Sequence, residues 1–363
     1  MKKTHKISVM SLLIASIAMF ASSVILLIAF SVSTAFSDVF EALVASRLRY
    51  ILSLLTGWFG FSLFEILLLC ILPLFVSLAV LIILKKIKFS TLSLSIFFAV
   101  SISAFVFVSS FGVCYFCLPS YNKMGIERER VDRKELYECS EKLKSLLDST
   151  LESVTFSYSG ASVNPHGWNK TDNLIDRGFE CLRNEYAFIS KSHSVSKRIM
   201  LSGPMTYTHI SGIYMPLTGE ANVNTNYPDY VVVFSMAHEK AHQRGIASED
   251  EANFIAFLAL SASEDSYLQY CAYMSMYDYF LDSMYLYDSE MYFYLISCLD
   301  SRVKGEMYAY SVFFDRYRSS RASEFADSVN DTYIKAMGDD KGVDSYGLVV
   351  EIMCAYIKER TLQ

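Results

Sequence analysis

The chain has little charge and no surplus of positive charge. Charged residues make up 19% of its 363 residues, and 32 lysines and arginines face 38 aspartates and glutamates, which gives a formal net charge of −6. Proteins that bind nucleic acid present a basic surface to the phosphate backbone, so this balance argues against a nucleic-acid partner. Hydrophobic residues, by contrast, make up 53% of the chain, which is more than an ordinary soluble enzyme carries.

The eight cysteines form no quartet with the spacing of a metal site. Cys114 and Cys117 form a C-x-x-C pair, but no βαβ pattern surrounds it, so the pair gives little support to a redox role. The cysteines of the C-terminal part stand singly, and either buried thiols or a disulfide would suit them. They are Cys139, Cys181, Cys271, Cys298 and Cys354.

The hydrophobic excess lies almost entirely before residue 120, in three apolar runs. Each run has the roughly 20 apolar residues that a helix needs to cross a bilayer. The first follows a cluster of lysines and could be read as a signal peptide, but it is too long for a typical signal sequence. We therefore predict a multi-pass protein of the cell membrane, in contact with the lipid bilayer. Its membrane region is residues 1–118, with spans at about 7–30, 61–84 and 92–118.

The distribution of lysine predicts the orientation of these spans. Lys2, Lys3 and Lys6 precede the first run, and three more lysines, within residues 85–88, lie between the second and third runs. With three spans, both clusters fall on the same side of the membrane, and the positive-inside rule makes that side cytoplasmic. The N-terminus is then cytoplasmic, and residues 119–363 form an extracytoplasmic domain.

Two features of the membrane region admit more than one interpretation. Residues 38–58 place apolar residues at helical spacing, with Arg47 and Arg49 off the apolar stripe. This is typical of a helix in the membrane interface, although packing against the soluble domain would suit it as well. Glu65, near the start of the second span, could be an intramembrane carboxylate. We favour a capping box from Ser62 to Glu65, which would begin that helix.

The C-terminal domain is predicted to be mainly α-helical, with a small sheet. It begins with a charged amphipathic segment at residues 133–154. After Lys197, short alternations with Gly, Pro, Thr and Tyr indicate strands and turns, and from Asp229 helical patterns return. The Tyr- and Met-rich stretch of residues 267–294 is interpreted as packing surface, because its aromatic residues recur at helical spacing.

Two of the six histidines stand four residues apart. His238, Glu239 and His242 form an H-E-x-x-H motif in a helix-compatible segment. One turn of α-helix places the two imidazoles on one face, where they can share a Zn²⁺ ion. Glu239, beside them, can hold a zinc-activated water and take its proton as the general base. The motif also occurs on ordinary exposed helices. The residues that follow it are therefore needed to distinguish a zinc site from such a helix.

A zinc site of this kind needs a third protein ligand. Gly245 can end the helix in a left-handed turn, and Ser248 is a natural N-cap for a second helix, with Glu251 completing a capping box. Three acids, at residues 249–251, occupy the first turn of that helix, where the helix dipole alone would favour them. Glu249 differs from its neighbours because Asn253 follows four residues later, where its amide can hydrogen-bond to a ligating histidine.

The pattern H-E-x-x-H followed by E-x-x-A-N resembles the gluzincin class of zinc metallopeptidases, including the membrane-embedded CAAX prenyl proteases. The resemblance implies one Zn²⁺ per chain, held by His238, His242 and Glu249, in an α+β, zincin-like domain with a helical C-terminal half. Metzincins would place a third histidine where this chain has Ser248, which argues against that class.

Several further landmarks resemble an uncharacterised bacterial membrane family, the domain-of-unknown-function family 3810. That family has three N-terminal spans and a metallopeptidase-like outer domain, so the resemblance implies both for this chain. It implies no substrate, since the family has none assigned. The landmarks, in order, are FSLFEILLL, SYNKMGI, SGIYMPLTGEANVN, AHEKAHQRGIASEDEANF and YIKAMGDDKGVDSYGLVV.

Mechanism suggests further site residues. In gluzincin-like folds a strand at the edge of the cleft pairs with the substrate backbone. Gly212, Ile213 and Tyr214 are the candidate strand, although a plain structural strand would explain them equally well. The transition-state oxyanion needs a donor besides zinc. No histidine follows His242, which leaves Tyr346 and Tyr214 as candidates.

Two hypotheses of function follow from these patterns. The first is a zinc-dependent metalloendopeptidase, a hydrolase that cuts peptide or protein substrates near the outer membrane face. The second is a non-catalytic membrane sensor or scaffold that retains the metallopeptidase fold. The intact set of His238, Glu239, His242 and Glu249 favours the first, because an inactive relative would more often lack the base or a ligand.

Overall fold

The computed structural model describes residues 2–318, 323, 324, 328 and 346–362. The chain forms two compact units, and each is described by itself. The first unit includes two short segments from the C-terminal half of the chain, and the second contains the remainder of that half. The first consists of residues 1–118, 192–194 and 215–220, and the second of residues 119–191, 195–214 and 221–363.

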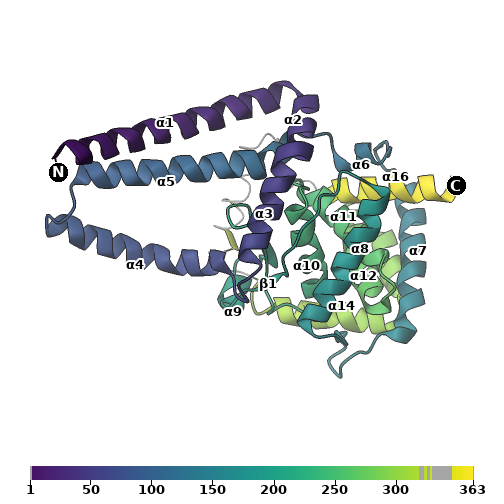
Figure 1. Cartoon of the computed structure of the whole chain (residues 1–363). Helices are drawn as coiled ribbons and strands as arrows, with labels where there is room; N and C mark the ends of the chain where they lie inside the picture. The colour runs from purple at the N-terminus through teal and green to yellow at the C-terminus, as the bar shows by residue number, and fades with distance from the viewer. Residues whose placement is uncertain (1, 319–322, 325–327, 329–345, 363) are drawn as a thin grey trace. The chain divides into compact units, whose positions relative to one another are not determined.

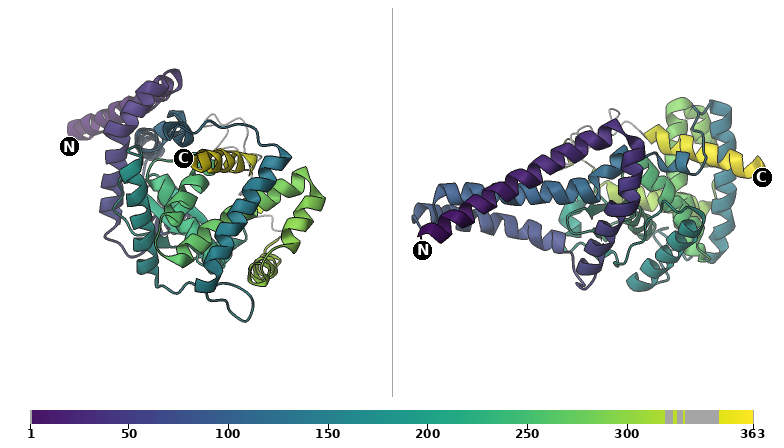
Figure 2. Two further views of the ribbon diagram at one scale, coloured as in Figure 1. Left: turned by 90° about the vertical axis from the view of Figure 1, so that its right-hand side faces the viewer. Right: turned by 45° about the horizontal axis from the view of Figure 1, so that its top comes forward.

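Three long apolar helices dominate the first unit (Figure 1): α1 (Lys2–Val32), α4 (Leu63–Ile83) and α5 (Phe89–Ser110). Each is long and apolar enough to cross a membrane, which agrees with the predicted membrane association. Helices α1 and α5 lie side by side (Figures 1 and 2), and the ring centroids of Phe20 and Phe97 are 6.2 Å apart. Most side chains of α4 are exposed, as expected of a helix surrounded by lipid. The orientation of the helices stays a prediction.

Helix α5 ends at Ser110 rather than continuing to the predicted residue 118. The chain turns there into a short 3₁₀ helix, η2 (Gly112–Phe116), which lies against α1 and α5. Val113 and Cys114 in η2 are buried. The run remains apolar past the end of α5 because these residues pack within the protein.

A helical segment connects α1 to α4 as predicted, but it contains a buried ion pair that was not predicted. It consists of α2 (Thr34–Phe40), a π-helical turn η1 (Glu41–Ala45) and α3 (Ser46–Thr56). Arg49 is 1% exposed and donates to Oε2 of Glu41 at 2.9 Å and to the carbonyl oxygen of Ser110 at 2.7 Å. A buried guanidinium needs such partners to offset its lost hydration.

Two side chains hold the start of α4. The hydroxyl of Ser62 accepts the backbone N–H of Glu65 at 3.0 Å, as the predicted cap requires. The carboxylate of Glu220, the first residue of β3 (Glu220–Val223), accepts the backbone N–H groups of Leu63 and Phe64 at 3.1 and 3.0 Å. The first N–H groups of α4, which have no partner inside the helix, are therefore satisfied. The part played by Glu220 was not predicted.

The second unit is mainly helical with one small sheet, as predicted. Its helices are α6 (Ser120–Lys123), α7 (Arg133–Thr150), η3 (Leu151–Ser153), α8 (Trp168–Glu185), α9 (Ser202–Thr206), α10 (Asp229–Gln243), α11 (Glu249–Ser261), α12 (Ser266–Tyr287), α13 (Ser289–Ser297), α14 (Ser301–Phe314) and α16 (Tyr346–Leu362).

The core of the second unit lies around α12. Helix α7 runs along α12, and α10 and α11 pack against α12 and against each other. Helix α8 approaches α11 so closely that a Cβ atom on Gly178 would lie 2.0 Å from the carbonyl oxygen of Ala259. Helix α16, yellow in Figures 1 and 2, packs against α11 and α12. The motif-bearing helices α10 and α11 are thus held in the centre of this unit.

The aromatic stretch of residues 267–294 is packing surface only in its first part. Tyr267, Tyr270 and Tyr277 on α12 are buried, but Tyr285 and Phe293 are 55% and 63% exposed. The helical spacing of the aromatic residues is the same in both parts. Tyr285 lies in the last turn of α12, next to the fully buried Met284, and Phe293 lies on α13.

The sheet has three short strands, β1 (Lys197–Arg198), β2 (Gly212–Met215) and β3, in the order β1-β3-β2. β1 runs parallel to β3, with Lys197 opposite Asn222. The amide of Asn222 also donates to the carbonyl of Ile213 at 3.2 Å, which fixes β2 against β3. Gly212, Ile213 and Tyr214 therefore lie on an edge strand, and their role in substrate binding stays a prediction.

Candidate metal centre

Helix α10 carries the H-E-x-x-H motif, and its ends follow from the local sequence. It begins directly after Pro228, which cannot donate a helical hydrogen bond. It ends where Gly245 adopts a left-handed φ of +96°. There the N–H of Gly245 donates to the carbonyl of His242 at 2.9 Å, and the N–H of Ile246 donates to that of Ala241 at 3.2 Å. This is the predicted stop signal.

Helix α11 begins at Glu249, directly after Ser248, as predicted, and it packs against α10. The predicted capping box is wrong. Within the described residues, the Ser248 side chain makes no cap bond. Glu251 instead accepts the backbone N–H of Ser120 at 2.5 Å. A partner far away in sequence has taken the carboxylate that the local pattern assigned to the cap.

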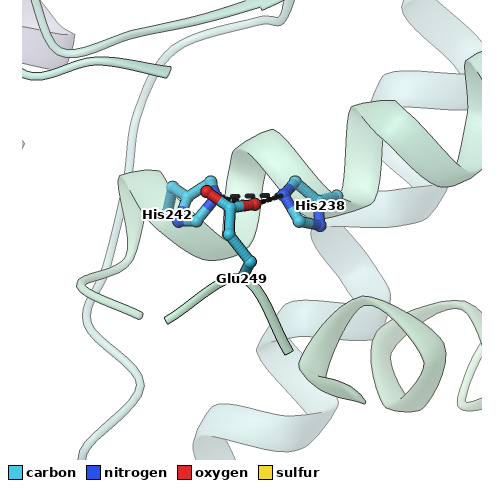
Figure 3. Close-up of side chains that lie close together, drawn as sticks. All are labelled: His238, His242 and Glu249. Atoms are coloured by element: carbon cyan, nitrogen blue, oxygen red, sulfur yellow. Dashed lines mark hydrogen bonds and ion pairs between the residues drawn. The ribbon is translucent and has the colours of Figure 1, made fainter. Parts of the chain in front are cut away.

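Three donor atoms from the two helices converge, and Figure 3 shows the carboxylate of Glu249 reaching toward both imidazoles. Nε2 of His238 lies 3.0 Å from Nε2 of His242 and 3.1 Å from Oε2 of Glu249. Nε2 of His242 lies 3.6 Å from the same oxygen. A metal site needs at least three His, Cys, Asp or Glu side chains close together. Among the described residues, His238, His242 and Glu249 form such a group. The residues that the resemblance implies as ligands are thus brought together.

Each imidazole has its other nitrogen next to an oxygen acceptor. Nδ1 of His238 lies 2.7 Å from Oδ1 of Asn253, and Nδ1 of His242 lies 2.7 Å from the carbonyl oxygen of Ile246. An acceptor at Nδ1 keeps the proton on that nitrogen, so the Nε2 lone pair of each neutral ring points into the shared space. Asn253 therefore occupies the position predicted for it, behind His238.

The cluster is short of positive charge. Two nitrogen lone pairs and a carboxylate oxygen lie this close together only where a cation offsets their repulsion. Burial disfavours a charged imidazole at His242, but the charge of Glu249 outweighs burial and raises the pKa of His242 to about 9. Partial loss of water around the half-exposed Glu249 acts against its charge too, yet the two histidines hold the pKa of its carboxyl well below the ordinary value. The cluster therefore attracts either a proton or a metal ion.

The donor types suit zinc, and one of the three donor separations matches that around a bound ion while the other two are shorter. Ligands about 2.0–2.2 Å from a tetrahedral Zn²⁺ lie roughly 3.3–3.6 Å apart, and the three separations here are 3.0, 3.1 and 3.6 Å. Two neutral imidazoles and a carboxylate are the donor set of His₂Glu catalytic sites, which keep a fourth position open. The side chain of Glu249 is 49% exposed, so water can reach the cluster.

Glu239 lies beside the cluster but is held away from it. Its side chain is buried, and the backbone N–H of Tyr214 on β2 donates to its carboxylate. Its Oε2 atom has no hydrogen-bond partner among the described residues. Burial, partly offset by the nearby histidines, raises the pKa of the Glu239 carboxyl to about 7. Such a carboxyl can both accept and release a proton near neutral pH.

Strand β2 lies directly against this carboxylate. A Cβ atom on Gly212 would lie 2.5 Å from Oε1 of Glu239 and 2.7 Å from its Cγ. Any side chain at this position would displace either the strand or the carboxylate. The sequence marks Gly212 only as part of a strand, whereas the structure makes it the residue that gives Glu239 its place.

The opposite face of α10 carries a buried charge network that was not predicted. Lys240 is fully buried, and its Nζ lies 2.9 Å from Asp172 and 2.8 Å from Asp176 on α8. Arg244 lies 2.6 Å from the same Asp176. The two cations and the two acids are each spaced four residues apart, and this matched spacing is the signal that could have revealed the network. It fixes how α10 lies on α8.

Of the two candidate oxyanion donors, the structure describes the side chain of Tyr214 but not that of Tyr346. Tyr214 is buried on β2, and its backbone contacts Glu239. Tyr346 is the first residue of α16, but its side chain lies outside the described part of the chain. Both roles stay predictions.

These features define a mainly helical protein with three apolar N-terminal helices and a cluster of two histidines and a glutamate on two packed helices. The family model described as Protein of unknown function (DUF3810) matches residues 40–354, and the chain belongs to this family. The predicted family membership is confirmed. No curated protein and no solved structure matches the chain.

Proposed function

We propose that this protein is a membrane-anchored zinc metallopeptidase that hydrolyses peptide bonds in peptide or protein substrates. The observation that carries the proposal is the convergence of His238, His242 and Glu249 beside the buried carboxylate of Glu239. The donor types are those that zinc prefers, and the three donor atoms lie close together. The carboxylate of Glu239 lies next to them, and its Oε2 atom has no hydrogen-bond partner among the described residues. This combination is what metal-assisted hydrolysis requires.

His238, His242 and Glu249 would hold the zinc ion, as in the gluzincins that the sequence resembles. Asn253 and the carbonyl of Ile246 would keep both imidazoles in the tautomer that leaves Nε2 free to ligate. Bound zinc supplies Lewis acidity, which polarises a carbonyl group and makes water easier to deprotonate.

Glu239 would act first as a general base and then as a general acid. Its Oε2 would accept a proton from water as the water oxygen bonds to the carbonyl carbon of the substrate. The carboxyl would then give this proton to the leaving nitrogen as the C–N bond breaks.

Strand β2 would receive the substrate. It lies at an edge of the sheet and contacts Glu239 through Gly212 and Tyr214. An extended peptide can add to such an edge as a further strand, which would bring its backbone past the base. The lysine clusters at the N-terminus and at residues 85–88 favour an outer-face location for this reaction.

Metal analysis of the purified full chain tests the proposal. Protein prepared without chelators should contain about one zinc per chain by elemental analysis. Glu239→Gln should keep the zinc and lose hydrolysis of an unstructured protein substrate, because the change removes the proton acceptor but no ligand. His242→Ala should lose the zinc as well. A wild-type preparation without any divalent metal would contradict the proposal.

A surface variant provides the control. Glu138→Gln alters an exposed carboxylate on α7 and should leave zinc content and hydrolysis unchanged. If wild type and Glu239→Gln both hold zinc and both fail on diverse peptides, the non-catalytic sensor or scaffold becomes the better explanation.

A further inference from the structure

Glu220 is a fully buried carboxylate that serves a helix far away in the sequence. Its two oxygens accept the backbone N–H groups of Leu63 and Phe64, at 3.1 and 3.0 Å. A carboxylate at a helix N-terminus gains from charge-assisted hydrogen bonds and from the helix dipole. Ser62 already caps the next N–H, that of Glu65. The start of α4, a candidate membrane span, is therefore completed by a residue of strand β3.

Glu220 also lies at one end of a short hairpin. The turn at residues 216–219 joins β2 to β3, and residues 215–220 group with the first compact unit while the rest of both strands groups with the second. Gly219 has a φ of +68°, and a Cβ atom there would lie 2.9 Å from Cβ of Leu52 on α3. The turn is thus close-packed against α3 and bonded to α4, so it has little freedom to shift within the first unit.

The other end of the hairpin lies against the proposed base. Gly212 would place a Cβ 2.5 Å from Oε1 of Glu239, and the N–H of Tyr214 donates to the same carboxylate. The amide of Asn222 fixes Ile213 of β2 against β3. A displacement of this hairpin at Glu220 would therefore reach the carboxylate of Glu239 through a covalently continuous strand only a few residues long.

We propose that Glu220 is a positioning residue that ties the start of α4 to strand β2 and, through β2, sets the place of the Glu239 carboxylate. The link between Glu220 and β2 stands on the contacts above, whereas its effect on catalysis rests on the proposed function. A plain helix cap is the competing explanation. A cap would hold α4 alone, but a positioning residue couples α4 to β2 in both directions, since coupling between two sites is reciprocal.

Hydrogen–deuterium exchange of the full chain in detergent micelles or vesicles separates these explanations. Glu220→Gln replaces the charged acceptor and should accelerate exchange by about tenfold, the lower end of what a hydrogen bond to a charged group supports. We expect this at residues 63–64 and also at residues 212–215. Faster exchange at residues 63–64 alone would overturn the proposal and leave Glu220 as a cap.

Two further variants keep the test decisive if Glu220→Gln does not fold. Gly212→Ala pushes β2 away from Glu239 and leaves Glu220 in place, and reciprocity requires faster exchange at residues 63–64. Unchanged exchange there would overturn the proposal. Ser62→Ala removes only the bond to Glu65 and leaves both Glu220 bonds in place, so exchange at residues 212–215 should change much less than in Glu220→Gln. An equal increase in exchange at residues 212–215 in Ser62→Ala and Glu220→Gln would overturn the assignment to Glu220.

The catalytic consequence is measured separately. Glu220→Gln should keep its zinc and lower kcat by about tenfold, which corresponds to roughly 1.4 kcal/mol of lost transition-state stabilisation. Unchanged kcat would overturn the assignment of Glu220 to the reaction. Exchange and zinc content are measured without substrate, so an inactive wild-type protein would refute the peptidase proposal and leave the test of coupling intact.

Discussion

Glu249, Asp250 and Glu251 occupy successive positions in the first turn of α11, yet their carboxylates have different surroundings. Glu249 reaches both imidazoles. Glu251 accepts the N–H of Ser120, and Asp250 is buried at a third position around the helix. Successive side chains point about 100° apart around an α-helix, so one of the three faces the histidines. Direction, rather than residue type, selects the ligand.

Alanine substitution should separate Glu249 from Glu251. Glu249→Ala should release zinc, because it removes one of three protein ligands. Glu251→Ala should keep zinc and lose only the bond to Ser120. Asn253→Ala should weaken zinc binding by about 10–100-fold, because His238 loses the acceptor that orients it. Zinc affinity is measured by competition with a chelator of known strength.

The matched pair is Glu249→Ala against Glu251→Ala, since both remove a glutamate from the same helical turn. If Glu251→Ala empties the site while Glu249→Ala leaves it full, the register of the proposed ligand set is wrong by two residues. Equal losses from both would point to general unfolding of α11 rather than to ligation.

At the scale of secondary-structure elements, the packing of α10 against α12 contains a carboxyl whose pKa no basic group among the described residues lowers. Asp278 on α12 is partly buried and accepts the hydroxyl of Tyr230 on α10 at 3.5 Å. Burial, together with the charges of Asp282 and Glu306, raises the pKa of Asp278 from 3.8 to about 8, and the bond from Tyr230 offsets only part of this. The folded protein therefore keeps Asp278 protonated at neutral pH.

This shift predicts how stability depends on pH. Between pH 4 and pH 8 the folded state holds a proton on Asp278 that the unfolded chain has lost, so its contribution is full below pH 4 and lost as pH rises to 8. Asp278→Asn removes the titration and keeps an acceptor for Tyr230. The variant should gain stability over wild type by up to about 1 kcal/mol per pH unit in this window. Thermal midpoints from pH 5 to 8 measure the difference.

An exposed acid serves as the control for this series. Glu138→Gln on α7 should shift the thermal midpoint little, and equally at every pH, because its carboxylate is solvated in both states. A difference between Asp278→Asn and wild type that stays constant from pH 5 to 8 would show that Asp278 is ionised in the folded protein.

Helices α10 and α11 show which features could be predicted from the sequence and which could not. The ends of α10, the left-handed Gly245 and the start of α11 were predictable, because each depends on residues within one helical turn. The partners of Glu220 and Glu251 were not, since both carboxylates bind backbone groups more than a hundred residues away. A local pattern cannot distinguish a free capping carboxylate from one that the tertiary fold uses elsewhere.

The same limit applies to buried charge. Arg49 was placed on the polar face of an interfacial helix, but it is buried with Glu41 as its partner. Lys240 is likewise buried between Asp172 and Asp176. The approach of α8 gives Lys240 its partners. The partner of Arg49 lies eight residues earlier in the same helical segment, farther than the one-turn spacing of an ordinary helical ion pair.

At the scale of the whole molecule, the predicted topology, in which all three candidate spans cross the membrane, would place residues 2 and 362 on opposite sides of it. Three lysines lie at the start of α1, and three more lie in the connection from α4 to α5. The connection from α1 to α4 carries only Arg47 and Arg49, and Arg49 is neutralised by Glu41. With Arg49 paired, the predicted outer connection carries less free positive charge than the sequence alone suggests. The difference in positive charge between the two predicted sides, on which the predicted orientation depends, is therefore larger.

The last prediction concerns this orientation. A reporter enzyme that is active only outside the cytoplasm should be active when fused after Gln363 and inactive when fused after Lys86, in the connection from α4 to α5. Three spans require opposite results at these two positions, and the lysine clusters decide which is outside, because lysine near the ends of spans is retained in the cytoplasm. A reporter that is active in the cytoplasm provides the control and should give the reverse pattern. If the fusion after Gln363 behaves as cytoplasmic, His238 and Glu249 lie inside the cell, and any substrate of the metal centre has to be sought there.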